Sequence, residues 1–513
     1  MRCASIIRMM NHFLTEEVFT NGVSKYLKEF EYQNAVQDDL WEHLNDEANT
    51  MQIVDLPATV KEVMDTWTLQ TGYPVVNAMR DGQNVTVNQK RFLLDSTATE
   101  ETPTYWYVPL NLVRSSNVAE FDSTNATVWL YPNASSVEFT LDQDDEWYII
   151  NAQQTGYYRV NYDEKNWEAL NKTLSESHEV IHVINRAQIL DDALNLARAG
   201  LLNYTIALSL TQYLGQEKSY IPWATTADNL SYLRRMLETS GKYEEYRAYI
   251  LSLIKDVLAR VGFEFPVLED VPANGNYPDV TEVMYNELIW GTACQMGEPW
   301  CHGNATEQFR NWKGNYNQSA PDQALLNPNI KGLVYCEGVR SGTVEDWDFV
   351  YEHYNKTNYA AERTLLLAAM ACTKESWLLN KYLYMLLDPV TNGIRSQDVS
   401  RAFAYIAANP IGRAEAFKFV KVNWDHLKES YGGGISALGR FISPFSNFNT
   451  QYELELLQTL KRENEGTLGS AARAMDQTIE SVVINIEWMN KNFDAVVGWL
   501  EANNAGGRGI SVL

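Results

Sequence analysis

The chain has 513 residues, enough for about three domains at the usual size of roughly 150 residues each. Its hydrophobic content of 45% and aromatic content of 12% are typical of a globular protein with sizeable cores. A formal net charge of −25 argues against a nucleic acid or an anionic membrane surface as partner, because both attract a basic protein surface.

The chain shows no targeting or membrane segment. Residues 1–7 enter a helical pattern directly, without the apolar stretch and cleavage site of a signal peptide. The longest apolar run, residues 365–372, is far shorter than the roughly 20 residues that a membrane helix needs. Residues 504–513 lack the hydrophobic tail of a lipid-anchor signal. We therefore expect no transmembrane segment and no lipid anchor in this chain.

Residues 1–68 are predicted to be helical and to form the first domain. Apolar residues, among them Ile6, Ile7, Phe13 and Leu14, recur there at helical spacing. Pro57 is expected to open a further helix over residues 58–67, because proline is favoured in the first turn.

Residues 69–165 are predicted to form a small β-sandwich. Short runs rich in β-branched and aromatic residues alternate there with Asp-Gly, Pro-Asn and Asp-Asp turns. The seven predicted strands are residues 73–78, 84–87, 105–113, 127–131, 137–141, 147–150 and 157–162.

Residues 166–513 are predicted to form a large all-α domain. Apolar residues recur at helical spacing, and Asp-Pro, Asn-Gly and Asn-Pro breaks separate successive helices. Helix pairs over this length indicate a superhelical, bowl-like domain or a curved bundle. We expect Trp347, Trp377 and Trp424 to lie in its core.

Two features indicate an oxidising, secretory history. The chain has five cysteines, Cys3, Cys294, Cys301, Cys336 and Cys372. It also has nine N-x-[ST] sequons, which are candidate glycosylation sites. A destination outside the cytosol conflicts with the missing signal peptide, and the conflict suggests that the beginning of the protein is missing. The sequon asparagines are Asn84, Asn125, Asn133, Asn171, Asn203, Asn229, Asn304, Asn317 and Asn355.

Four segments resemble zinc aminopeptidases of the aminopeptidase N type. They are residues 4–9 (ASIIRM), 67–75 (WTLQTGYPV), 155–163 (TGYYRVNYD) and 184–193 (INRAQILDDA). The resemblance extends from residue 4 to about residue 500. It implies the C-terminal half of such an enzyme: a helical remnant of the catalytic domain, the β-sandwich and the helical C-terminal domain.

The resemblance also implies disulfides and a location. Cysteine pairs of the family's C-terminal domain correspond to Cys294 with Cys301 and to Cys336 with Cys372. Family members are extracellular or bound to the cell surface, and the intact enzyme acts on peptides. A homodimer remains open.

The family's catalytic residues have no counterparts in this chain. Its zinc is held by H-E-x-x-H and by a glutamate after an eighteen-residue spacer. Its catalytic tyrosine belongs to Tyr-x-Lys-Gly-Ala, and that tyrosine would lie immediately before Met1. The resemblance therefore implies no catalytic residue and no cofactor here, although the intact enzyme needs zinc.

One segment, residues 178–182, nevertheless spells H-E-x-x-H, so His178 and His182 with Glu179 are candidate zinc ligands. A third ligand at the family spacing would fall on Leu201, which cannot bind metal. Asp191 or Asp192 could replace it, but no spacing rule supports either. In the resembled family this stretch is an extended link, so we favour solvated linker histidines and no metal site.

Two functions remain open from the sequence. The chain is the C-terminal portion of a zinc aminopeptidase, in which the helical domain caps a substrate chamber, or it is a catalytically silent extracellular binding module. The resemblance implies that the first helices pack on a part of the catalytic domain that is missing here. For the chain expressed alone we therefore expect Ile6, Ile7, Phe13 and Leu14 to form an exposed apolar patch, and residues 1–68 to be sensitive to proteases while the rest resists.

Overall fold

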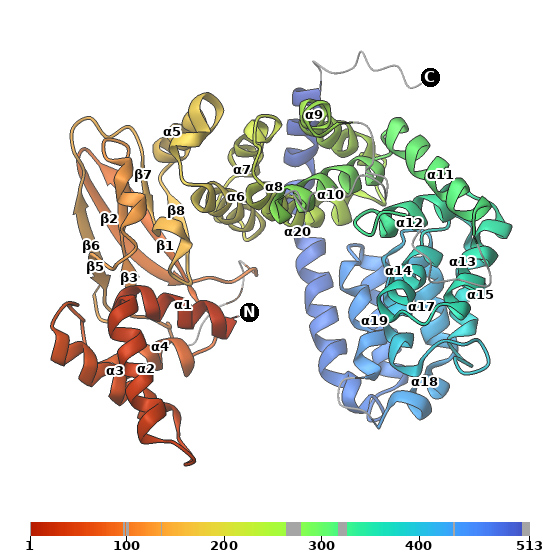
Figure 1. Cartoon of the computed structure of the whole chain (residues 1–513), viewed down its shortest axis with the longest axis horizontal. Coiled ribbons are helices and arrows are strands. Elements are labelled where there is room, and N and C mark those ends of the chain that lie inside the picture. Colours follow the sequence, from red (N-terminus) through yellow and green to blue (C-terminus); the bar gives the residue numbers. More distant parts are fainter. Residues whose placement is uncertain are drawn as a thin grey trace. The chain divides into compact units, whose positions relative to one another are not determined.

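The structure is a computed structural model that describes residues 2–95, 98, 102–134, 136–262, 279–316, 326–433 and 437–504. The chain divides into two compact units (Figure 1). Unit 1 comprises residues 1–217 and 221–229, and unit 2 comprises residues 218–220 and 230–513. The fold is mixed α+β, with a small sheet region followed by a large helical region, as the sequence predicts.

Unit 1 begins with four helices, which precede its strands. The last of them, α4, begins at Val60 instead of residue 58, because Thr59 caps it. The backbone N–H of Glu62 donates to Thr59 Oγ1 (3.2 Å), and the Thr59 N–H donates to Glu62 Oε2 (3.0 Å). The four helices are α1 (Arg2–Leu14), α2 (Glu16–Glu29), α3 (Gln37–Met51) and α4 (Val60–Thr68).

The β region contains eight strands in three sheets. A four-stranded sheet has the order β6-β2-β1-β8, in which β1 and β8 run parallel and the other neighbours antiparallel. Two antiparallel pairs, β3-β5 and β4-β7, form the remaining sheets. The strands are β1 (Pro74–Asp81), β2 (Asn84–Arg91), β3 (Val108–Leu110), β4 (Leu112–Arg114), β5 (Val128–Leu130), β6 (Val137–Thr140), β7 (Tyr148–Ile150) and β8 (Arg159–Tyr162).

The predicted strand over residues 105–113 is divided in the structure. Asn111 is buried between β3 and β4, where the chain passes from one sheet to another. Its side-chain amide donates to the Thr124 carbonyl (3.0 Å) and accepts from the Ala152 N–H (2.7 Å). These non-local contacts fix the break.

The expected apolar patch on the first helix is wrong for three of its four residues. Ile6, Phe13 and Leu14 are buried, and only Ile7 is exposed. The Phe13 ring packs edge-on against Trp129 of β5, with centroids 5.2 Å apart. The helices of residues 2–68 and the sheets thus share one core inside unit 1.

Four further helices complete unit 1 or lead out of it. The first, α5, is capped by Asp163, whose carboxylate accepts from the Asn166 N–H (3.1 Å). The helices are α5 (Glu164–Ser177), α6 (Val183–Arg198), α7 (Tyr204–Ser209) and α8 (Tyr220–Leu237), of which α8 crosses the boundary between the units.

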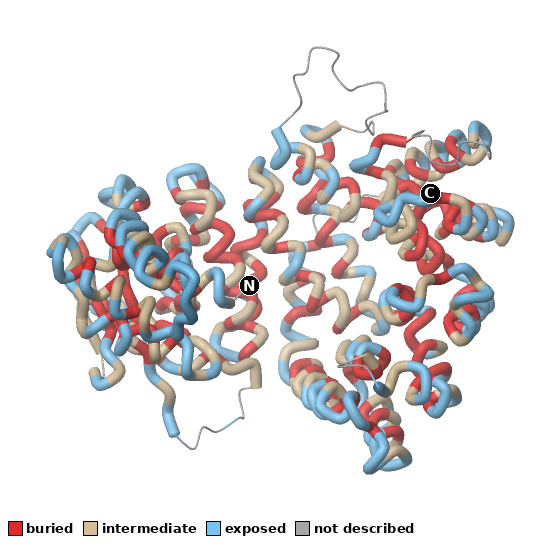
Figure 2. Tube along the Cα trace, turned by 60° about the horizontal axis from the view of Figure 1, so that its bottom comes forward, coloured by how far each residue is buried: buried red, intermediate tan, exposed pale blue. Residues whose placement is uncertain are grey.

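Unit 2 is built from helices, most of which pack on the helix before or after them in the chain. Buried residues run as stripes along these helices (Figure 2). The helices are α9 (Tyr243–Val261), α10 (Val280–Gln295), α11 (Pro299–Gly314), α12 (Lys331–Ser341), α13 (Val344–Lys356), α14 (Ala360–Met370), α15 (Ser376–Met385), α16 (Val399–Ala408), α17 (Gly412–Val422), α18 (Trp424–Tyr431), α19 (Gln451–Glu463) and α20 (Ala472–Asn504).

The long helix α20 joins the first and last parts of unit 2. It packs on α19 and also on α9. At its end the Asn504 amide donates to the Glu245 carbonyl (2.8 Å), and Trp499 packs edge-on against Tyr249 (5.0 Å between centroids). The last helix of unit 2 therefore contacts both α19, which precedes it, and α9, near the start of the unit.

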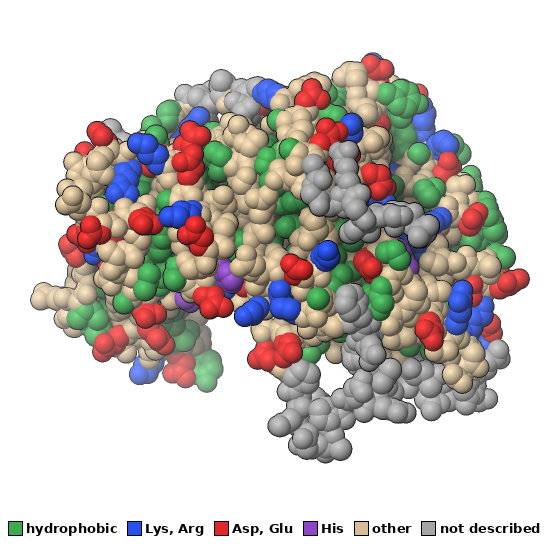
Figure 3. Space-filling model, turned by 90° about the horizontal axis from the view of Figure 1, so that it is seen from above, with side chains coloured by type: hydrophobic (Ala, Val, Ile, Leu, Met, Phe, Trp, Pro, Cys, Tyr) green, Lys and Arg blue, Asp and Glu red, His purple; other side chains and the backbone are tan. Residues whose placement is uncertain are grey.

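The tryptophan prediction holds for two of three residues. Trp347 and Trp424 are buried, whereas Trp377 on α15 is 52% exposed, so its core assignment is wrong. Acidic and basic side chains are interspersed on the face shown in Figure 3. None of the described helices combines the length and the apolar character that crossing a membrane requires.

Candidate functional site

The two candidate zinc histidines do not lie on one helix. His178 begins a 3₁₀ helix, His178–Val180, that follows α5 directly. Ile181 is extended, and His182 is the N-cap of α6, where its Nδ1 accepts from the Ile184 N–H (3.3 Å). The geometry that presents both imidazoles of H-E-x-x-H one turn apart is absent from these residues.

Each of the two histidines has a structural role instead. His178 is buried, and its ring lies 5.5 Å from the Tyr213 ring, so the expectation of a solvated histidine is wrong here. Burial and the nearby charge of Arg186 lower the pKa of His182. Arg186 fixes the segment between them, since its guanidinium donates to the Ile181 carbonyl (2.7 Å) and pairs with buried Glu217 (2.7 Å).

We therefore predict that residues 178–182 bind no zinc. Protein washed with chelator and re-equilibrated with zinc should retain a substoichiometric amount, measured by atomic emission. The His178→Gln/His182→Asn variant should retain the same amount. Stoichiometric zinc that disappears in this variant would show that the segment is a metal site.

One other group of potential ligands lies close together among the described residues: Cys294, His302 and Glu337. The sulfur of Cys294 is already bonded to Cys301. A cysteine binds a metal through its free thiolate, which the disulfide-bonded Cys294 does not have, so this group does not make a cation site. The carboxylate of Glu337 is instead paired with His302 Nδ1 (2.5 Å) and with Arg340 (2.8 Å).

Both disulfides implied by the family resemblance are present in unit 2. Cys294–Cys301 joins the end of α10 to the start of α11, with Cα atoms 5.1 Å apart. Cys336–Cys372 joins α12 to the segment after α14, with Cα atoms 5.3 Å apart. Cys3 on α1 is a free thiol and is exposed.

The sequon asparagines differ in what surrounds them. Of the nine, Asn317 lies outside the described residues. Asn229 lies inside α8, where its Nδ2 donates to Asp191 Oδ1 (2.9 Å) and to the Thr225 carbonyl (2.9 Å). A glycan on Nδ2 would replace one of these N–H donors. Five sequon asparagines are exposed: Asn84, Asn125, Asn133, Asn203 and Asn355.

We predict that Asn229 stays unmodified when the chain is produced in a secretory host. Enzymatic deglycosylation in heavy-oxygen water converts each modified asparagine to a labelled aspartate, which mass spectrometry detects. Label is expected among the five exposed sequons and not at Asn229. Label at Asn229 in folded protein would contradict the hydrogen-bond network around it.

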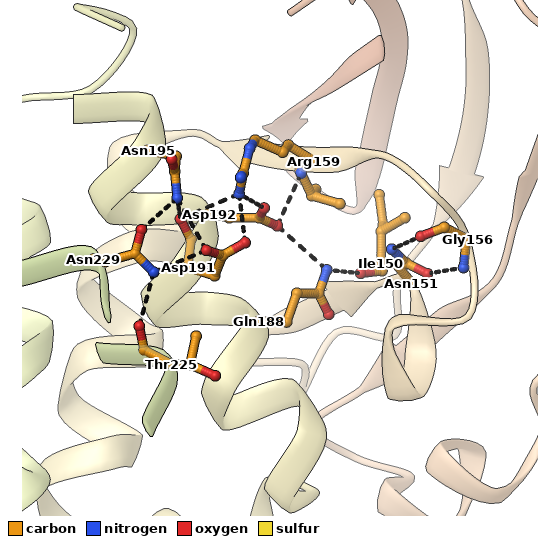
Figure 4. Close-up of polar contacts among 11 residues, drawn as sticks. Ile150, Asn151, Gly156, Arg159, Gln188, Asp191, Asp192, Asn195, Thr225 and Asn229 are labelled. Carbon is orange, nitrogen blue, oxygen red and sulfur yellow. Dashed lines mark hydrogen bonds and ion pairs between the residues drawn. The ribbon is translucent and has the colours of Figure 1, made fainter. Parts of the chain in front are cut away.

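That network belongs to a larger polar cluster of unit 1 (Figure 4). Strand β8 supplies Arg159, and helix α6 supplies Asp191 and Asp192. Arg159 Nη1 lies 2.7 Å from Asp191 Oδ2 and 3.1 Å from Asp192 Oδ1. Asp192 Oδ2 also accepts from the Val160 N–H (3.0 Å). One guanidinium thus joins the parallel strand pair to α6.

Both carboxylates of this cluster accept several hydrogen bonds from neighbouring side chains and backbone. Asp191 Oδ1 accepts from Asn195 (2.9 Å) and from Asn229 (2.9 Å). Burial raises the pKa of Asp192 to about 7, with the charge of Arg159 opposing and that of Asp191 reinforcing the shift. Asp191 and Asp192 in turn raise the pKa of Arg159 despite its burial.

The cluster lines a cavity of about 310 Å³. Its walls come from α1, from the segment before β1, from the loop before β8, and from β8 and α6. The lining residues are Ser5, Arg8, Tyr73, Gln154, Thr155, Gly156, Tyr157, Tyr158, Arg159, Asp191 and Asp192.

The loop before β8 has an unusual backbone. Three of its residues have positive φ without being glycine: Asn151 (75°), Gln153 (50°) and Gln154 (50°). Each costs about 1 kcal/mol or more, and such strain persists only where surrounding contacts hold it. Here Asn185 Oδ1 accepts from the Gln153 N–H (2.7 Å), and Arg8 donates to the Gln154 carbonyl (2.9 Å).

The raised pKa of Asp192 predicts a pH dependence. The folded protein holds this proton more tightly than an unfolded chain, in which an aspartate titrates near pH ~4. The stability that Asp192 contributes is therefore complete below pH ~4 and is lost as pH rises toward its folded pKa of about 7. When the pH rises from ~4.5 to ~7.5, the free energy of unfolding of wild type should fall by more than about 1 kcal/mol relative to that of Asp192→Asn.

Urea unfolding of both proteins at the two pH values measures this difference, because all other titrating groups cancel. Asp144→Asn, in an exposed turn, is the control and should follow wild type. A constant difference between wild type and Asp192→Asn would show that Asp192 is ionised throughout this range.

Comparison with known proteins agrees with the architecture. Residues 147–484 match the family model described as ERAP1-like C-terminal domain, and residues 1–67 match the model described as peptidase family M1 domain. The chain is 35% identical over 509 residues to aminopeptidase N of Homo sapiens, covering 98% of this chain and 50% of the relative.

Two further relatives are covered to a similar extent. Aminopeptidase Ey of Gallus gallus is 35% identical over 513 residues, covering 98% of this chain and 50% of the relative. Glutamyl aminopeptidase of Mus musculus is 34% identical over 507 residues, covering 97% and 49%. The chain thus spans about half the length of the curated relatives that it matches.

Proposed function

Since the chain belongs to the ERAP1-like C-terminal domain family of M1-type aminopeptidases, we propose that it is the C-terminal portion of a zinc-dependent aminopeptidase. Such an enzyme removes N-terminal residues from peptides. The observation that carries the proposal is the match of 98% of this chain to one continuous half of aminopeptidase N.

In this proposal the chain contributes three domains and no catalytic residue. Residues 1–68 end the catalytic domain, residues 69–165 form the β-sandwich, and residues 166–513 form a helical cap over the substrate chamber. The zinc ion of the intact enzyme polarises the attacking water. Its ligands belong to the part of the enzyme that this chain does not match.

The proposed location is extracellular or at the cell surface. Two disulfides support it, because disulfides persist in oxidising compartments. Peptides are the proposed partners of the intact enzyme, nucleic acids are not, and a homodimer is the simplest assembly to test.

The proposal predicts that the 513-residue chain alone has no aminopeptidase activity. Aminoacyl-anilide substrates should release no anilide above background, with or without added zinc, when absorbance is followed. Intact aminopeptidase N in the same assay is the positive control. Turnover that a chelator abolishes would overturn the assignment of the catalytic residues to another part of the enzyme.

A catalytically silent binding module is the second candidate, and the cavity beside Arg159 favours it. The two candidates differ in whether the protein as the cell makes it carries the zinc ligands. The same anilide assay on protein purified from its natural source separates them.

A further inference from the structure

We propose that the cavity of unit 1 binds the carboxylate of a small ligand through Arg8. Free amino acids and the C-termini of short peptides share this chemistry. The inference stands apart from the proposed enzymatic function, because it concerns only residues of unit 1.

The cavity is lined by charged side chains of both signs. Four charged side chains line it: Arg8, Arg159, Asp191 and Asp192. Arg159 pairs with both aspartates, at 2.7 and 3.1 Å. No carboxylate among the described residues pairs with Arg8, so its positive charge remains uncompensated. A nearby anion would be attracted to it.

Two backbone carbonyls accept hydrogen bonds from Arg8. Nη1 donates to the Gln154 carbonyl (2.9 Å) and Nη2 to the Gln153 carbonyl (3.3 Å). A guanidinium has five N–H donors, and the others have no acceptor among the described residues. A carboxylate accepts two parallel N–H bonds from such a fork. Arg8 is therefore held in place with donors to spare.

Both carbonyls belong to the strained loop before β8. The positive φ values of Gln153 and Gln154 turn their carbonyls toward Arg8. Strain of this kind accumulates at binding sites, where it fixes groups before the ligand arrives. The buried Asn151 side chain secures the loop by accepting from the Gly156 N–H (2.7 Å) and donating to the Gly156 carbonyl (3.1 Å), as Figure 4 shows.

Two further observations support an anion. Burial and, to a smaller extent, the positive charge of Arg8 lower the pKa of His12, which lies one turn further along α1. Arg159, also in the cavity wall, has a buried Nε without a hydrogen-bond partner among the described residues.

The cavity walls indicate which carboxylates fit. The rings of Tyr73 and Tyr157 lie 5.1 Å apart and both line the cavity. They offer apolar contact area beside the guanidinium. A volume of about 310 Å³ suits one or two amino-acid residues. A cationic ligand fits poorly, because both aspartates are already occupied by donors.

Isothermal titration calorimetry of the full chain with N-acetyl-phenylalanine tests the proposal. N-acetyl-phenylalanine amide, which lacks the carboxylate, is the matched ligand and should show no binding. Free phenylalanine and alanyl-phenylalanine distinguish the two sources: the dipeptide binding more tightly indicates a peptide C-terminus, and free phenylalanine binding more tightly indicates an amino acid.

Arg8→Met should weaken binding about tenfold or more, since a hydrogen bond to a charged group contributes about 1.5–3 kcal/mol. Arg8→Lys keeps the positive charge but not the paired N–H donors of the guanidinium, so its affinity should lie between those of wild type and Arg8→Met. Lys28→Met, on the exposed side of α2, removes the same charge away from the cavity and should bind like wild type. Circular dichroism confirms that each variant is folded.

Equal affinity of wild type and Arg8→Met for N-acetyl-phenylalanine would overturn the proposal. So would equal binding of the acid and the amide, or no heat of binding for any of the carboxylates at millimolar concentration.

Discussion

Replacing Arg159 with methionine is expected to lower the free energy of unfolding by roughly 3–5 kcal/mol at neutral pH. Methionine keeps most of the volume and the flexibility of the arginine side chain. The substitution removes the only cation that contacts Asp191 and Asp192 among the described residues. Asp192 would be left buried with a like charge beside it. The loss should shrink as pH falls, because protonation of Asp192 removes that charge. Urea unfolding monitored by circular dichroism measures both effects.

The double variant Arg159→Met/Asp192→Asn is the matched control for this prediction. Because it removes a charge on each side of the pair, it should recover a substantial part of the lost stability. If Arg159→Met alone costs less than about 1 kcal/mol, the pair contributes no more than an exposed ion pair. The description of the cluster as the link between β8 and α6 would then be wrong.

Removing the disulfide Cys336–Cys372 is expected to cost about 4 kcal/mol. The two cysteines are 36 residues apart in sequence, and the bond restricts the unfolded chain more as the loop lengthens. The double variant Cys336→Ala/Cys372→Ala should therefore unfold at a lower urea concentration than wild type. Unfolding of both proteins under identical non-reducing conditions measures the difference.

The other disulfide of unit 2 provides the comparison. Cys294 and Cys301 are 7 positions apart, and the same entropic argument assigns their bond about 2–3 kcal/mol. The critical result is which disulfide, when removed, lowers the free energy of unfolding more. A larger loss for Cys294→Ala/Cys301→Ala would contradict the loop-length argument and would locate the stabilisation in the folded state.

Local sequence patterns predicted most of the fold. The Asp-Gly turn at residues 81–82 fixed the hairpin of β1 and β2, although both strands extend beyond the predicted runs. The division of residues 105–113 could not be predicted, because Asn111 makes its hydrogen bonds with residues 13 and 41 positions away. Trp377 shows the same limit, since helical spacing does not reveal which face of a helix its neighbours cover.

The site was harder to predict than the fold. The sequence singles out the segments around Arg159 and Asp191 by their family resemblance, and Asp191 as a possible metal ligand, but not their ion pair, because the two residues are 32 positions apart. The strained loop at residues 151–154 left no signal, because none of its residues with positive φ is glycine. Conversely, H-E-x-x-H is a clear pattern whose meaning depends on helical geometry that residues 178–182 do not adopt.

The central claim is that this chain is the C-terminal portion of a zinc aminopeptidase, and sequencing the transcript upstream of the Met1 codon tests it most directly. The account predicts an open reading frame that continues into Tyr-x-Lys-Gly and, further upstream, into H-E-x-x-H with a glutamate after an eighteen-residue spacer. An in-frame stop codon immediately before Met1 would contradict it and would establish the chain as a catalytically silent product.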